Sequence, residues 1–149
     1  MTPKQVLDRG VGELTKVLEP AGFVFIDSGE DSDSHGAFAR GDFLRGDRRL
    51  ELQVRSSLGL VRYHFGDYVL SHEDLIHGVR GTERIPGPSE YPGFSNDPLA
   101  PFRHLGGDLE RFGAVFLSGG AKAFRALKKW IDKNPRRSGL AALEPNPTR

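Results

Sequence analysis

Residues 37–70, AFARGDFLRGDRRLELQVRSSLGLVRYHFGDYVL, carry several strand-like runs separated by recognisable turns. Apolar and polar residues alternate at 50–54 and again at 61–65, which is the period of a strand with one buried and one solvated face. Short polar turns that contain glycine, at 45–48 and 56–59, separate these runs. The stretch therefore predicts three adjacent antiparallel strands.

The first of these strands, near 38–44, has an irregular pattern. Phe38 and Phe43 are separated by an odd number of positions, so one of them faces outward unless a bulge intervenes. Glycine in a strand often marks such a bulge. We expect the bulge at Gly41.

The residues before this stretch predict a helix and one short strand. Thr2-Pro3-Lys4-Gln5 has a capping hydroxyl, a proline at the first helical position and a glutamine three residues after the cap. Pro20 and Gly22 end the helix, and residues 23–26 are apolar enough for a strand that joins the sheet. The acidic, serine- and glycine-containing run 27–35 is expected to be a mobile loop.

The residues after the stretch predict helices separated by one long loop. Ser71 is a cap for a short helix that is expected to close near Gly78 or Gly81. Five prolines in 82–107 disfavour regular structure, although the aromatic and aliphatic residues there indicate that the loop packs on the body. Asp108 is expected to cap a further helix, and a last helix over about 121–133 ends before Asn134-Pro135.

These elements predict an α+β fold, in which an antiparallel sheet of three to five strands has N-terminal and C-terminal helices packed on one face. A chain of 149 residues with 37% hydrophobic content fits a single domain, which we place at 1–135, followed by a flexible tail at 136–149. The sequence holds no cysteine and no apolar run of membrane-spanning length. We expect a cytoplasmic protein that does not enter the membrane.

No pattern in the sequence specifies catalysis, a metal or a cofactor. A cluster of His64, Asp67 and His72 is conceivable, but no pair among the histidines has a spacing that fixes metal geometry. The chain also lacks a Gly-x-Ser-x-Gly nucleophile motif and a glycine-rich phosphate motif. We expect no cofactor, no metal and no catalytic residue, and a hydrolase of unknown type is the third functional hypothesis.

Charge is distributed unevenly along the chain. From Ala121 onward eight Lys and Arg face two acidic residues, whereas the remainder is net acidic. The last helix carries one stripe of cations, which we call the basic stripe: Lys122, Arg125, Lys129 and Lys133. The stripe favours a polyanion, either a nucleic-acid backbone or an acidic protein, over an uncharged partner. Its structural alternative is a solvated helix face whose cations suit the helix C-terminus.

A second candidate surface is the polar face of the predicted sheet. If the helices cover only one face, the other remains open, as antiparallel sheets allow. We expect a protein partner to dock there and on the nearby Pro-rich loop, with Arg55 and Arg62 as its charged centre and Tyr91 or Phe94 as its apolar edge. The predicted partner-binding residues are Glu51, Gln53, Arg55, Arg62, His64, Tyr91 and Phe94.

The order of these segments also resembles a group of known proteins. An opening helix, AGF at 21–23, FARGDF at 38–43, LELQVRSSLGLVRYHFGDYVLSHEDL at 50–75 and late helices are similar to several small bacterial α+β proteins of unknown function, some of which accompany polymorphic toxins as immunity proteins. The resemblance implies a binding role, in which a rigid domain blocks a toxin or serves another bacterial complex. It implies no catalytic residues. Nucleic-acid binding is the second hypothesis.

Overall fold

The computed structural model describes residues 1–136. Their five strands form one antiparallel sheet in the order β1-β2-β3-β4-β5. The predicted α+β class is confirmed. The elements in chain order are α1 (Pro3–Leu18), β1 (Val24–Asp33), β2 (Gly36–Arg45), β3 (Arg48–Val54), β4 (Leu58–Phe65), β5 (Tyr68–Ser71), α2 (His72–Glu83), α3 (Ala100–Phe112), α4 (Ala114–Leu117) and α5 (Ala121–Lys133).

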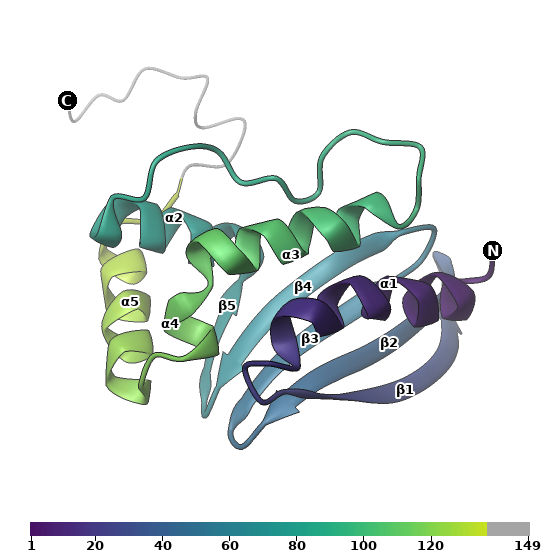
Figure 1. Ribbon diagram of the computed structural model, residues 1–149, viewed down its shortest axis with the longest axis horizontal. Helices are drawn as coiled ribbons and strands as arrows, with labels where there is room; N and C mark the ends of the chain where they lie inside the picture. Colours follow the sequence, from purple (N-terminus) through teal and green to yellow (C-terminus); the bar gives the residue numbers. More distant parts are fainter. Residues whose placement is uncertain (137–149) are drawn as a thin grey trace.

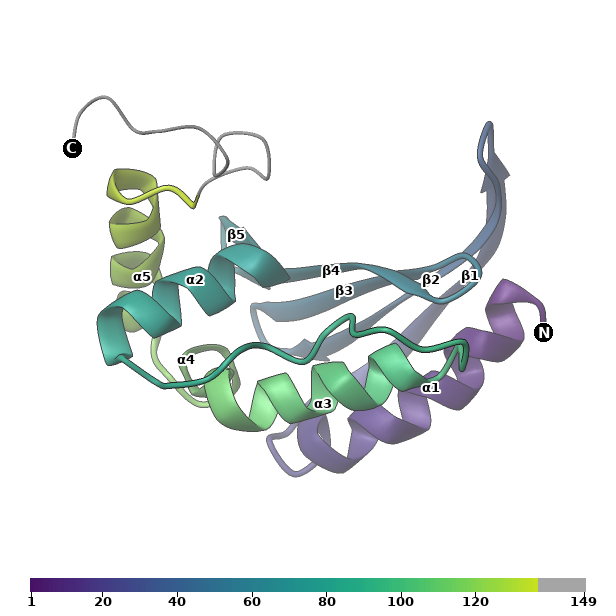
Figure 2. The same ribbon diagram turned by 90° about the horizontal axis from the view of Figure 1, so that it is seen from above.

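The helices cover one face of the sheet. Figure 1 shows α1 and α3 side by side across the strands, and α2, α4 and α5 gathered at the end where β5 lies. In Figure 2, seen from above, these helices lie on one side of the sheet or beside its end, and no described helix lies over the other side of β1–β4. The core forms between the sheet and this helical layer, with Leu50, Leu52 and Val54 of β3 buried in it. The opposite side, which we call the open face, is left uncovered by the described residues.

The ends of α1 and the start of α2 follow the sequence signals. Thr2 and Gln5 form the capping box, with the Thr2 hydroxyl accepting from the Gln5 amide and the Gln5 side chain accepting from the Thr2 amide. Ser71 caps α2 by accepting from the Asp74 amide. The predicted turn at 45–48 places Gly46 at positive φ, where glycine has no steric penalty. These local predictions are confirmed because cap and turn geometry depend on neighbouring residues alone.

Helix α2 ends at Glu83, close to the later of the two predicted positions, but neither Gly78 nor Gly81 terminates it. Both glycines lie where α5 packs against α2. A Cβ at Gly78 would stand 2.7 Å from a methyl carbon of Ile131, and one at Gly81 would stand 2.2 Å from the Trp130 ring. The glycines permit close helix packing instead of ending the helix.

The predicted mobile loop at 27–35 is also wrong. Most of it belongs to β1, which pairs with β2 from Val24 opposite Leu44 to Asp33 opposite Gly36. Backbone hydrogen bonds to β2 hold this polar segment, and Lys4 of α1 forms an ion pair with Asp27. The strand therefore forms without an alternating apolar pattern of its own.

The expected bulge at Gly41 is absent from β2, and the register shift lies instead in β1 between Asp27 and Gly29. Gly41 serves a different purpose, since a Cβ there would lie 2.3 Å from the Phe25 ring. Phe38 accordingly faces away from Phe43 and lies on the open face. It is nevertheless buried, because the guanidinium carbons of Arg40 and Arg55 lie 5.6 and 5.0 Å from its ring centroid.

Asp108 does not cap a helix, which corrects the sequence prediction. The long loop ends at Leu99, and α3 begins at Ala100 with Pro101 in its first turn, where proline is tolerated. Asp108 consequently lies inside α3 and is buried. The remaining loop, residues 84–99, packs on the body through Tyr91 and Ile85, as expected from its composition.

The last helix is confirmed as α5, with Phe124, Leu127 and Ile131 buried. Arg136 follows it and donates to the Asp74 carboxylate over 2.8 Å. The rest of the predicted flexible tail, residues 137–149, lies outside the described residues. Within residues 1–136, no helix has both the length and the apolar character that a membrane crossing requires.

Candidate binding surface

The middle of the open face carries a connected set of charged side chains, which we call the central network: Asp42, Arg49, Glu51, Arg62 and His64. The register aligns Asp42, Glu51 and Arg62 across β2, β3 and β4, and puts Arg49 beside His64. Side chains on one face of neighbouring strands lie within reach of each other. The sheet register therefore assembles the network.

The contacts run from one strand to the next. Arg49 donates to the Asp42 carboxylate over 3.2 Å, and its other terminal nitrogen lies 3.2 Å from His64 Nε2. His64 Nε2 is also 2.8 Å from Glu51 Oε1, and Arg62 lies 3.9 Å from the same oxygen. Burial raises the pKa of Asp42 above its usual value, and the Arg49 charge offsets only part of this effect.

Arg55 lies outside this network. It donates to Asp33 Oδ2 over 2.5 Å and to the Gly36 carbonyl over 3.1 Å, so it holds the end of the β1–β2 hairpin and covers Phe38. Arg62 pairs across the sheet with Glu51, four residues before Arg55 on β3. Both arginines lie on the open face as predicted, but they are not neighbours there, and of the two only Arg62 belongs to the central network.

The open face as a whole is balanced in charge. Its arginines are Arg40, Arg49, Arg55 and Arg62, and its carboxylates are Asp31, Asp33, Asp42 and Glu51. Aliphatic side chains are exposed at both edges, namely Val24 and Ile26 on β1 and Val69 on β5. Gln53 lies half-buried between the charged groups, on the same side of β3 as Glu51. The face thus combines mixed charge with apolar margins.

The two loop residues predicted for the apolar edge do not border the open face: Tyr91 is buried, and Phe94 is exposed elsewhere. Tyr91 is only 8% exposed, and its hydroxyl donates to the Leu58 carbonyl over 2.8 Å. Phe94 is fully exposed, in the loop that runs beside α3 on the helical side of the molecule (Figure 2). The open face and the loop are therefore two distinct surfaces.

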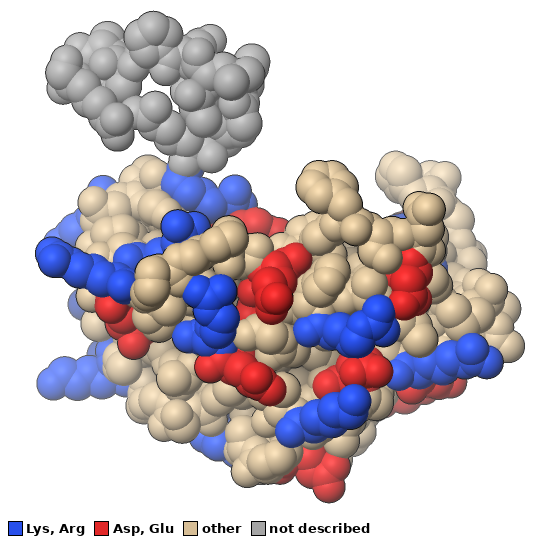
Figure 3. All heavy atoms as spheres, turned by 45° about the horizontal axis from the view of Figure 1, so that its top comes forward, with Lys and Arg blue, Asp and Glu red and all other residues tan. Residues whose placement is uncertain are grey.

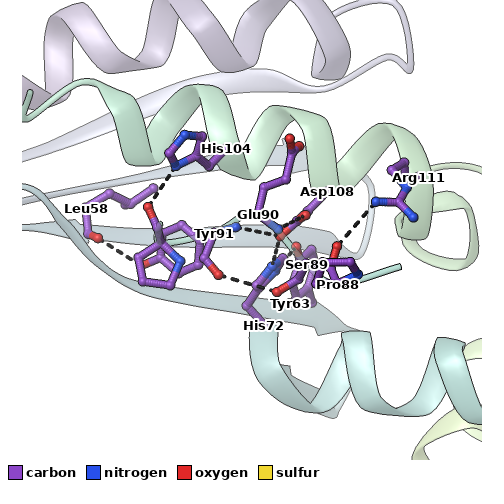
Figure 4. Close-up of polar contacts among 11 residues, drawn as sticks. Leu58, Tyr63, His72, Pro88, Ser89, Glu90, Tyr91, His104, Asp108 and Arg111 are labelled. Carbon is purple, nitrogen blue, oxygen red and sulfur yellow. Dashed lines mark hydrogen bonds and ion pairs between the residues drawn. The ribbon is translucent and has the colours of Figure 1, made fainter. Parts of the chain in front are cut away.

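Beneath the loop lies a buried chain of polar groups that the sequence did not reveal (Figure 4). Tyr63 Oη lies 2.8 Å from His72 Nδ1, and His72 Nε2 lies 2.9 Å from Asp108 Oδ2. The Asp108 carboxylate also accepts from the backbone amides of Glu90 and Tyr91 over 2.7 and 3.0 Å. We call Tyr63, His72 and Asp108 the buried relay. It joins β4, α2, α3 and the loop.

The relay is sealed from solvent and connects four segments of the structure. Tyr63, His72 and Asp108 are all almost wholly inaccessible to solvent. Burial raises the pKa of the Tyr63 hydroxyl well above its usual value, and the neighbouring Asp108 charge adds to the shift. Burial also raises the pKa of Tyr91 to about 12. Both phenols are thus neutral groups that complete hydrogen bonds in the interior.

The imagined His64, Asp67 and His72 cluster does not form. His64 lies on the open face, whereas His72 belongs to the buried relay on the helical side, and Asp67 lies in the turn between β4 and β5. Among residues 1–136 no group of three histidine or acidic side chains is arranged to hold a metal ion.

The basic stripe is where the helical pattern placed it. Its four cations are exposed on α5, and in Figure 3 Lys and Arg gather toward the end of the molecule formed by α2 and α5. Arg125 lies 6.0 Å from the Tyr68 ring centroid, whereas Lys128, outside the stripe, pairs with Asp132.

The chain matches no known protein family model. Comparisons with curated proteins and with solved structures likewise give no significant match.

Proposed function

We propose that this chain is a protein-binding module whose partner docks on the open face of the sheet. The observation that carries the proposal is a sheet face that no described helix covers over β1–β4, with four arginines balanced by four carboxylates and aliphatic residues at both edges. Protein interfaces combine mixed charge with apolar contact in this way. The central network supplies specificity, because a partner must match charges that the sheet holds in fixed positions.

The balance of charge favours a protein over a nucleic acid on this face. Nucleic-acid binding depends on cations that neutralise phosphates, and an equal number of carboxylates opposes it. The basic stripe of α5 supports nucleic-acid binding as the second candidate, on a different surface. Four phosphate contacts there correspond to a log–log salt slope of about −3.6 on duplex DNA.

An immunity role is the specific form of the proposal. A rigid cytoplasmic domain that covers a toxin acts by affinity and needs no catalytic group, which agrees with the sealed position of the buried relay. The rigidity has a source in the structure, because the sheet is a continuous meander with its core on one side. A preorganised surface loses less conformational entropy on binding.

The experiment is site-specific photo-crosslinking in the native host. A photoreactive residue at Gln53 places the probe on the open face, and one at Lys16, exposed on the outer side of α1, is the matched control. We expect a defined protein adduct from position 53 and none from position 16. Adducts from position 16 alone, or adducts to nucleic acid, would contradict the proposal.

A charge variant adds a quantitative test. Arg62→Glu changes an exposed side chain whose nearest carboxylate is 3.9 Å away, whereas Arg55 is unsuitable because it holds the hairpin. We expect Arg62→Glu to weaken the crosslinked partner's binding by about tenfold or more, as reversal of a central interface charge does. The double variant Lys129→Glu, Lys133→Glu on α5 should leave that affinity unchanged.

A further inference from the structure

A groove of about 560 Å³ lies between the end of α2, α4 and α5, away from the open face. Its apolar walls are formed by Ala114, Val115, Ala123, Ala126, Leu127 and Trp130. A volume of this size is typical of sites that bury a ligand group. The groove exists because small residues line it on both sides, so that α4 and α5 do not fill the space between them.

The polar groups in the groove are already satisfied. The Thr82 hydroxyl donates to the Gly78 carbonyl over 2.8 Å, and the Ser118 hydroxyl donates to the Ala114 carbonyl over 3.2 Å. Neither hydroxyl proton is available to a ligand without breaking a bond inside its own helix. The groove therefore offers an apolar surface, with the Glu83 carboxylate as the charged group among its lining residues.

The α5 side of the groove has a cationic rim. Lys122 precedes Ala126 by four residues and Lys129 follows it by three, so both side chains are helical neighbours of a groove residue. Lys133 bears the same relation to Trp130. These three lysines are exposed and form no ion pair with another described residue, whereas Lys128 on the other flank is paired with Asp132.

We propose that this groove binds an acidic amphipathic helix of a protein partner. Apolar side chains of the partner helix enter the groove, and its carboxylates meet Lys122, Lys129 and Lys133 on the rim. The charge of the rim selects an acidic helix over a basic one. The three lysines of the basic stripe are then one half of a composite site, and this site is separate from the docking of a partner on the open face.

Trp130 gives a direct measurement, because it is the sole tryptophan of the chain and forms part of the groove wall. The probe is a synthetic helical peptide with Leu along one face and Glu along the other. We expect a saturable blue shift of the Trp130 emission. The same peptide with Lys in place of Glu should bind at least about tenfold more weakly, because it meets the lysine rim with like charges.

Variants separate the groove from its charge. Lys122→Glu with Lys129→Glu should weaken the acidic peptide about tenfold, whereas Arg9→Glu with Lys16→Glu, an equal charge change on α1, should not. Ala126→Arg narrows the groove while adding a cation. We expect this variant to lose affinity for the acidic peptide, since apolar contact carries the binding.

Four results would overturn the proposal. The first is an emission spectrum that the acidic peptide leaves unchanged, and the second is tighter peptide binding by Ala126→Arg, as simple charge attraction predicts. The third is that short duplex DNA binds more tightly than the acidic peptide and displaces it, which would assign the lysines to nucleic acid. The fourth is an emission shift that depends on protein concentration alone, which would assign the groove to a second copy of the chain.

Discussion

Replacing Asp108 with alanine tests the claim that the buried relay fixes the loop to the body. The wild-type carboxylate accepts hydrogen bonds from His72 and from the amides of Glu90 and Tyr91. Its removal leaves two buried donors without an acceptor, on His72 and Tyr91, while solvent can reach the exposed Glu90. Each unsatisfied buried donor costs about 1–3 kcal/mol, so Asp108→Ala should lower the free energy of unfolding by about 4 kcal/mol.

The assay is urea unfolding followed by circular dichroism, with a thermal melt as a second measure. A domain of this size has a total stability of about 5–15 kcal/mol, so the loss is a large part of the whole. It corresponds to a decrease in melting temperature of about 10 °C. Amide hydrogen exchange should also show faster exchange at Tyr91, because its amide loses its acceptor.

Asp132→Ala is the matched control. Asp132 is an exposed acid on α5 that pairs with Lys128 one helical turn away, and such a pair contributes about 0.5 kcal/mol or less. If Asp108→Ala cost no more than Asp132→Ala, or if exchange at Tyr91 stayed slow, the loop would be held by something other than the relay. The account of the relay given above would then be refuted.

Three further predictions concern the pH dependence of the buried relay, the facing of β3 and the packing of α1. Burial by itself raises the pKa of Asp108, but the hydrogen bonds from His72 and the two loop amides outweigh it and hold the pKa below its usual value. A carboxyl with a lowered pKa stabilises the folded state above its unfolded pKa of about 3.9, and this stabilisation is lost as the pH falls through its folded pKa. The difference in unfolding free energy between wild type and Asp108→Ala should therefore narrow below about pH 4. A difference that stays constant in urea titrations across that range would contradict the prediction. Leu52→Asp should lower the free energy of unfolding by about 5 kcal/mol or more, because it places an unpaired charge in the core. The loss should clearly exceed that of Leu52→Ala. Equal unfolding midpoints for the two variants would show that Leu52 of β3 does not face the core. In α1, Gly12→Ala should stabilise the protein by about 0.5–1 kcal/mol, because nothing lies within 4 Å of the new Cβ. Gly10→Ala should destabilise it, because its Cβ would lie 2.4 Å from the Phe102 ring. Thermal melts that rank the two variants in the opposite order would refute the packing of α1 on α3.

Much of the candidate site depended on information that is not local in the sequence. The alternation at 50–54 and 61–65 was enough to assign Glu51, Gln53, Arg62 and His64 to one face, since side chains alternate along any strand. Which of these residues touch depends on register and on the neighbouring strand. Asp42 and Arg49 therefore joined the network only in the structure.

The buried relay shows the same limit more strongly. His72 follows a recognisable helix cap, but its partners Tyr63 and Asp108 lie 9 and 36 residues away along the chain. Local sequence predicts a helix start at Asp108, because aspartate is favoured at the N-cap position. The true start lies earlier, at a proline-containing turn whose helical geometry depends on packing against the sheet and α1.

Interactions between residues close together in the chain were enough to predict the capping box of α1, the Ser71 cap, the glycine turn at 45–48 and the apolar face of α5. Contacts between distant segments, by contrast, hold β1 together through its polar part. They also explain why Gly41 makes room for a ring instead of forming a bulge, and why Gly78 makes room for α5 instead of ending α2. A glycine has the same local preferences in both situations. Whether it breaks an element or lets a neighbour approach is set by the side chain opposite it, and that side chain is brought there by folding.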